Sequence, residues 1–162
     1  MSLTTRRLIR RALLVVAALL VVAQFVPVER TNPPSDPRNG LVAAAGPPPA
    51  VAAALDRSCR DCHSNDTRWP WYSRVAPASW LLAHDVEEGR SHLNFSEWAL
   101  LDSRRRGRRL EEICEEVTAG SMPDAKYVLL HPDARLAPAE ITAICDWTRR
   151  EAARLAVPPP SR

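Results

Sequence analysis

The chain has 162 residues, of which 46% are hydrophobic and 25% charged, and its formal net charge is +3. Residues 1–50 contain six of the 22 basic residues and two of the 19 acidic ones, a net charge of +4; the remaining 16 basic and 17 acidic residues give −1. The larger part of the chain is therefore nearly neutral. This balance excludes the broad basic surface of a nucleic-acid-binding protein, and we expect no nucleic-acid partner.

Residues 1–28 have the pattern of a signal anchor. Arginines at positions 6, 7, 10 and 11 precede an apolar run over residues 12–26 that only Gln24 interrupts. A positive flank before an apolar core is typical of secretory signals and signal anchors, and with its neighbours the run approaches the roughly 20 residues of a transmembrane helix. No small-residue cleavage site follows it directly. We therefore expect a single-pass inner-membrane protein whose remaining residues lie in the periplasm.

Prolines mark the next boundary. Residues 29–50 contain six prolines and two glycines, which is the composition of an extended, semi-rigid spacer. The sequence thus predicts a linker at 29–50, one folded domain at 51–157 and a tail at 158–162. A domain of about 107 residues is large enough for a single hydrophobic core.

The hydrophobic pattern of this domain predicts an all-α fold. Pro77 suits a first helical position and Gly89 a helix end, while Asn94 precedes a capping-box pattern. An apolar stripe at i, i+3, i+4 and i+7 begins at Leu110, and Gly120 follows it. No segment alternates as a strand does. The expected helices span residues 51–60, 77–89, 95–105, 108–118 and 138–155, with loops at 61–76 and 119–135.

The pentapeptide C-x-x-C-H at Cys59, Cys62 and His63 is the attachment signature of a c-type haem. Its two thiols add to the haem vinyl groups, and the histidine that follows lies under the iron and can ligate it. A C-x-x-C pair also occurs in zinc sites and in redox-active dithiols. A zinc site usually has a second such pair, whereas the remaining cysteines are isolated. A thioredoxin-like dithiol follows a strand, and no strand precedes Cys59. Haem is favoured over zinc, dithiol chemistry and a chance match.

Two further cysteines, Cys114 and Cys145, fall on separate expected helices. An oxidising periplasm turns thiols into disulfides, metal ligands or cofactor links. A Cys114–Cys145 bridge and a pair of buried free thiols acting as small hydrophobes are equally compatible with the sequence.

Met122 is the expected second axial ligand of the iron. It lies in the loop sequence AGSMP, where Gly120 permits a tight turn and Pro123 stiffens the chain, about sixty residues after His63. A methionine that only fills a gap in the core is the alternative. Among the histidines, His131 is the first substitute, because it follows on the same segment. The other two, at positions 84 and 92, are expected at the surface or in hydrogen bonds.

With these motifs placed, the chain resembles the bacterial haem-binding domain family over about residues 55–147. The resemblance is carried by CRDCHSN at 59–65, RWPWYS at 68–73, PASWL at 77–81, DVEEGR at 85–90, HLNFSEW at 92–98, GSMP at 120–123 and HPDA at 131–134. It implies one covalent haem c on a cytochrome-c-like helical fold. It implies no particular physiological task, and it does not include Cys114 or Cys145.

Residues near the pentapeptide offer further contacts for a haem. Trp69, Trp71 and Tyr72 can wall the cofactor and keep water from the iron, the alternative being ordinary core residues. A carbonyl of Pro70 or Pro77 could accept the ring N–H of His63. Either Arg68 or Arg74 could pair with a propionate, and otherwise both are surface residues. The arginine run at 104–109 is expected to be a solvated helix end, with a docking patch for an acidic partner as the alternative.

Together these patterns predict a periplasmic single-haem protein that transfers electrons and catalyses no reaction itself. Its cofactors would be haem c and iron, and its partners unidentified periplasmic redox proteins. The first alternative is a haem sensor or peroxidase-like enzyme with an open sixth site; the second is a zinc-binding module.

Overall fold

The computed structural model describes residues 2–157; the predicted tail at 158–162 lies outside them. The described residues form helices and no strand, which confirms the all-α class. The elements are α1 (Leu3–Ala23), η1 (Pro37–Asn39), α2 (Leu41–Ala45), α3 (Pro49–Ser58), α4 (Arg60–His63), η2 (Trp71–Arg74), α5 (Ala78–His92), η3 (Phe95–Leu100), α6 (Ser103–Ala119), α7 (Ala125–Leu130), η4 (Pro132–Ala134) and α8 (Pro138–Ala156).

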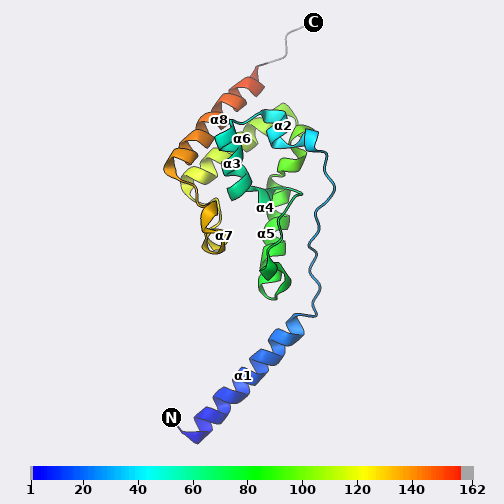
Figure 1. The fold of residues 1–162 in the computed structure, drawn as a ribbon, viewed down its shortest axis with the longest axis vertical. Coiled ribbons are helices and arrows are strands. Elements are labelled where there is room, and N and C mark those ends of the chain that lie inside the picture. Colours follow the sequence, from blue (N-terminus) through cyan, green and yellow to red (C-terminus); the bar gives the residue numbers. More distant parts are fainter. Residues whose placement is uncertain (1, 158–162) are drawn as a thin grey trace.

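Helices α6 and α8 form the framework of the domain. They pack along each other with α3 beside them, while α5 and α7 extend from this layer in the same direction (Figure 1). The side chain of Asp102 caps α6 by accepting the N–H of Arg105, and Gly120 ends the helix in the left-handed conformation at φ 73°. The core contains large apolar side chains from α3, η3, α6 and α8, with Trp98, Leu110 and Ile144 fully buried.

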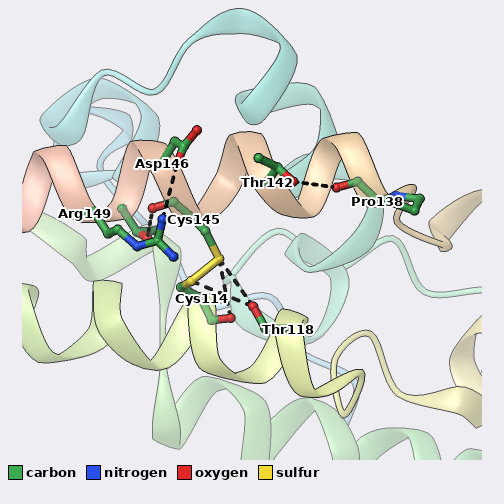
Figure 2. The surroundings of a disulfide bond; sticks show 8 residues. Cys114, Thr118, Pro138, Thr142, Cys145, Asp146 and Arg149 are labelled. Carbon is green, nitrogen blue, oxygen red and sulfur yellow. Dashed lines mark hydrogen bonds and ion pairs between the residues drawn. A yellow bond between two sulfur atoms is a disulfide. The ribbon is translucent and has the colours of Figure 1, made fainter.

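A disulfide joins the two framework helices. Cys114 of α6 and Cys145 of α8 are bonded, with their Cα atoms 4.8 Å apart (Figure 2). The hydroxyl of Thr118 lies 3.5 Å from the sulfur of Cys145. Of the two alternatives that the sequence left open, the bridge is therefore the one formed.

The N-terminal helix α1 forms where the anchor was expected and points away from the domain (Figure 1). No helix within residues 2–157 is long and apolar enough to cross a membrane, so the transmembrane anchor predicted at 1–28 is not supported. The physical reason is that the uncharged part of α1 is too short. Beyond the arginines, α1 continues only over residues 12–23, or about 18 Å at 1.5 Å per residue, against a hydrocarbon core of about 30 Å.

The predicted linker is not a free spacer. Its second half folds into η1 and α2, and Leu41 lies in the hydrophobic core with 1% exposure. Its first half runs along the domain in extended form. There Asn32 donates to the carbonyl of Thr67 at 2.9 Å and accepts from the indole N–H of Trp69 at 3.0 Å. The core therefore begins before residue 51, because an apolar leucine in a proline-rich segment can still be buried.

Four expected helices match α3, α5, α6 and α8, although α6 begins five residues earlier than expected. The loop expected at 61–76 contains most of α4 and all of η2, and two further segments differ. The helix expected at 95–105 is the short η3, capped by Asn94, and a new helix starts at Asp102. The loop expected at 119–135 contains α7, whose first turn Asp124 caps by accepting the N–H of Lys126. In both places an Asp marks a helix start that the apolar periodicity alone did not locate.

Candidate functional site

A cavity of about 590 Å³ opens between α5, α6 and α7, with α4 and the end of α3 in its wall. This volume is within the range of small-molecule and cofactor sites, about 300–1,000 Å³. Its apolar lining includes Leu81, Leu82, Leu93, Phe95, Ile113 and Val117. Charged side chains also line it: Asp85, Glu88, Arg109, Glu112, Glu116, Asp124 and Lys126. The cavity is thus an apolar cleft with a charged rim.

The three residues of the pentapeptide share one wall of this cavity. Cys59 precedes the single turn α4, and its carbonyl accepts the N–H of Cys62 at 3.3 Å and of His63 at 3.0 Å. Residues at i, i+3 and i+4 of a helical turn lie on the same face. The spacing C-x-x-C-H therefore becomes two thiols and an imidazole directed to the same side.

A backbone carbonyl directly after α5 orients His63. Its Nδ1 lies 3.0 Å from the carbonyl oxygen of Leu93, and since a carbonyl only accepts, Nδ1 carries the proton. The expectation that Pro70 or Pro77 supplies this acceptor is therefore wrong. Burial lowers the pKa of His63, which keeps the imidazole neutral, and Nε2 is the nitrogen left for a metal ion.

The electrostatics of the two thiols disfavour a reactive dithiol. Burial raises the pKa of Cys59 to about 12 and that of Cys62 to about 11. Catalytic C-x-x-C pairs need a lowered thiol pKa, because the thiolate is the nucleophile. Across residues 2–157, no group of three or more His, Cys, Asp or Glu side chains could hold a metal ion, so zinc gains no support either.

Gly89 brings α5 close to the cysteine turn. A Cβ atom at this position would lie 2.6 Å from the carbonyl oxygen of Cys62 and 3.2 Å from its Cβ. The sequence placed a helix end here, but α5 continues to His92. The residue is instead needed for the close approach of two backbones.

Met122 reaches the cavity from the segment after α6. Gly120 turns the chain, and the N–H of Met122 donates to the carbonyl of Glu116 at 3.3 Å. Its side chain is 39% exposed. The structure thus brings Met122 and His63 to the same cavity, while their role as the two axial ligands stays a prediction.

The three histidines other than His63 have different surroundings. His131 is not part of the cavity lining, and its Nε2 forms a 2.6 Å hydrogen bond with the hydroxyl of Tyr72. Its ring also stacks on Tyr127 at 4.3 Å. His84 is exposed beside Glu88, whereas His92 is exposed but contributes to the lining.

Only one of the three aromatic residues expected around the cofactor lines the cavity, namely Tyr72. Trp71 is 79% exposed, and Trp69 donates its indole N–H to Asn32 outside the lining. The aromatic pattern WPWY could not reveal this, because η2 turns successive side chains in different directions.

Asp61, between the two cysteines, was not identified from the sequence. Its carboxylate accepts the hydroxyl of Tyr127 at 2.8 Å and Nε of Arg68 at 2.9 Å. Arg68 also donates to the carbonyl of Asp56 at 2.7 Å. This arginine is thus bound to the cysteine turn rather than free for a propionate, and the exposed Arg74 is not in the lining. Arg109 and Lys126 are the cations that line the cavity.

A buried hydroxyl in the wall lacks a partner. Ser58 is 5% exposed, lines the cavity, and its Oγ makes no hydrogen bond to any residue of the described chain. Buried polar groups almost always have a partner, so this orphaned hydroxyl is consistent with a ligand in the cavity. Apolar walls, two thiols, a neutral imidazole and a thioether together fit a haem.

No curated protein and no solved structure matches this chain. The family model for a haem-binding domain matches residues 18–150, a span that includes every residue of the cavity from Ser58 to Leu130. The chain belongs to the haem-binding domain family.

Proposed function

We propose that this protein carries one covalently bound haem c and transfers electrons outside the cytoplasm. The observation that supports this most is the arrangement of one cavity wall: Cys59, Cys62 and His63 lie on it together, and Met122 enters the same cavity from another segment. When bound, the haem supplies an iron that cycles between the ferrous and ferric states.

The burial of the cysteines favours thioether attachment. Each S–H adds across a vinyl group, so an S–C bond forms and the hydrogen moves to the neighbouring carbon. The product sulfur is neutral. Since burial raises the pKa of both thiols, a neutral thioether suits this wall better than a charged thiolate.

The axial ligands would be Nε2 of His63 and the sulfur of Met122. The hydrogen bond to the carbonyl of Leu93 holds the imidazole ring and raises its basicity as a ligand. A thioether ligand raises the reduction potential relative to a second imidazole. With His63 and Met122 both bound to it, an iron would exchange electrons with little rearrangement and would offer no position to a substrate.

Two features support export. A disulfide between Cys114 and Cys145 persists in an oxidising compartment such as the periplasm. Residues 1–26 have the arginine flank and apolar core of an export signal. Unidentified redox proteins of the same compartment would be the electron donor and acceptor.

The test uses the full chain, produced in cells competent for cytochrome c maturation. We expect a pyridine haemochrome spectrum of the c type and haem that acid acetone does not extract. Replacing Met122 by Ala should leave the haem bound but lower the potential, whereas the control His131→Ala should keep the spectrum of the wild type. A colourless protein, or haem lost to acid acetone, would contradict covalent attachment. An unchanged potential in Met122→Ala would remove Met122 as ligand.

The 39% exposure of Met122 favours a second candidate function, a haem sensor or peroxidase-like enzyme in which this ligand is displaced. Carbon monoxide distinguishes the two. A ferrous spectrum that changes under carbon monoxide in the wild type supports the open site, and an unchanged spectrum supports the electron carrier.

A further inference from the structure

The exposed face of α6 carries an unusual distribution of charge. Four exposed residues follow one another at i, i+4, i+7 and i+11 along this face: Arg104, Arg108, Glu111 and Glu115. Because this spacing keeps side chains on one side of a helix, they form a continuous stripe about 16 Å long. Its first half is positive and its second half negative. We call it the charge stripe.

Electrostatics within the helix do not explain this order. The N-terminus of a helix favours anions, an effect confined to the first turn, so Arg104 opposes the macrodipole of α6. The pairs Arg104–Arg108 and Glu111–Glu115 are also like charges at i, i+4, which destabilise a helix. Within the stripe, the opposite charges Arg108 and Glu111 at i, i+3 form the one favourable pair.

The rest of the chain compensates them only in part: Asp102 lies beside Arg104 and Arg108 in one surface depression, and no other acidic side chain of the described residues outside the stripe pairs with them. Helix α8 packs on the side of α6 that carries Cys114, and the disulfide fixes it there (Figure 2). The cavity lies on another side, which carries Arg109, Glu112 and Glu116. Within residues 2–157, none of the four charge-stripe residues forms an ion pair. The stripe is therefore open to a partner.

We propose that the charge stripe binds a second copy of this chain, with the two α6 helices antiparallel about a two-fold axis near Leu110. In that arrangement the stripe faces itself in reverse order. Arg104 then faces Glu115 of the second copy, and Arg108 faces Glu111 of the second copy. A two-fold axis generates each pair twice, so every charge of the stripe meets the opposite charge.

The neighbouring stripe has the same order. Arg105, Arg109, Glu112 and Glu116 follow at the same spacing, and three of them line the cavity. A two-fold axis across the pair of α6 helices therefore places both cavities on the same side of the dimer. The inference is independent of the cofactor and would hold for the protein with or without haem.

Charge complementarity also predicts the salt dependence of this dimer. The interface is polar and small, so its affinity is low and depends on Coulomb attraction. At about 10 mM salt the Debye length is about 30 Å, and at 1 M it is about 3 Å. In sedimentation velocity we expect the mean mass of the full chain to rise toward twice the monomer at low salt, and to return to the monomer at high salt.

A charge swap provides the decisive test. The variants Arg104→Glu with Arg108→Glu, and Glu111→Arg with Glu115→Arg, each make the stripe uniformly charged. We expect each to be monomeric alone and an equimolar mixture of the two to regain the wild-type mass. The control Arg74→Glu with Arg135→Glu changes the same number of exposed arginines outside α6 and should associate as the wild type does.

Several outcomes would overturn the proposal. One is a wild type that stays monomeric at low salt, and another is a pair of swap variants that associate like the wild type. A mixture that remains monomeric would assign the arginines to a different, acidic partner. Circular dichroism and an intact Cys114–Cys145 bridge report folding. Should a double variant not fold, the single variants Arg108→Glu and Glu111→Arg, nearest the axis, take its place in the same mixing experiment.

Discussion

At the scale of single residues, Gly89 is the position where the least change should have the largest effect. Alanine would place a Cβ 2.6 Å from the carbonyl oxygen of Cys62, and the contact is with backbone, so α5 or the cysteine turn must move. Such overpacking costs about 1–3 kcal/mol. We expect Gly89→Ala to lower the free energy of unfolding by this amount, measured by denaturant titration, and to reduce the yield of bound haem.

Gly107 is the matched control, because it also lies inside a helix and a Cβ there would meet nothing within 4 Å. Gly107→Ala should be neutral or stabilising by up to about 1 kcal/mol, since alanine favours the helix. Equal stability of the two alanine variants would show that α5 and the cysteine turn are not in close contact.

The cysteine turn and its neighbours show which features of a site can be predicted from sequence and which cannot. The positions of Cys59, Cys62 and His63 follow from spacing, because i, i+3 and i+4 share a face of any helical turn. The acceptor for His63 could not be predicted, since the carbonyl of Leu93 has no side-chain signature and reaches the ring only through tertiary packing. The role of Gly89 was hidden likewise, as its reason is a contact with a segment 27 residues earlier.

At the scale of elements, Glu140 connects α8 to α3 through its carboxylate, whose charge depends on pH. Its carboxylate accepts the N–H of Ala137 at the start of α8 at 2.8 Å and pairs with Arg57 of α3 at 2.9 Å. The backbone hydrogen bond, followed by the contact with Arg57, lowers the pKa of Glu140. A carboxyl with a lowered pKa stabilises the fold above its unfolded pKa of about 4.3, and this stability is lost as the pH falls through the folded pKa.

We therefore expect Glu140→Ala to cost about 1 kcal/mol at pH 7, the usual value of a helix cap, and to cost much less near pH 2. Thermal unfolding of both proteins over this pH range measures the difference. Glu87→Ala, at an exposed position of α5, is the control and should change little at either pH. A penalty for Glu140→Ala that stays constant across the range would show that the charge of Glu140 contributes nothing.

The disulfide between α6 and α8 is a second determinant at this scale. It joins residues 31 positions apart, and closing a loop of this length in the unfolded chain corresponds to about 3–4 kcal/mol. Replacing Cys114 and Cys145 by Ser should lower the free energy of unfolding by this amount. A reductant should destabilise the wild type similarly and leave the double variant unaffected. A reductant effect of equal size in both proteins would contradict this role.

Which elements the sequence could predict depends on their length. Helices α5, α6 and α8 each span 15 residues or more, so their apolar periodicity repeats often enough to be recognised. Helix α7 has six residues, fewer than two turns, so its pattern does not repeat often enough to be recognised. It is held instead by tertiary contacts, among them the hydrogen bond from Tyr127 to Asp61. The burial of Leu41 was hidden for a similar reason, because its proline-rich surroundings indicate a spacer.

At the scale of the whole molecule, the cavity leaves part of the apolar core uncovered. Its wall contains Leu82, Phe95 and Val117, and covering apolar surface stabilises a fold by about 25 cal/mol per Å². A flat apolar cofactor held between α5, α6 and α7 would complete the core.

Loss of the haem should consequently loosen the whole domain rather than one site. We expect Cys59→Ser with Cys62→Ser, freed of haem, to unfold at least 10 °C below the haem-loaded wild type, because a ΔΔG of 1 kcal/mol shifts Tm by roughly 4–8 °C in a domain of this size. Hydrogen exchange should accelerate first in α4, α5 and α7, which line the cavity, and least in α6 and α8, which the disulfide joins.

The variant His92→Ala keeps both thiols and serves as the control for a lining side chain. An unchanged Tm in the haem-free double variant would show that water fills the cavity without cost, and the core of this domain would then be complete without its cofactor.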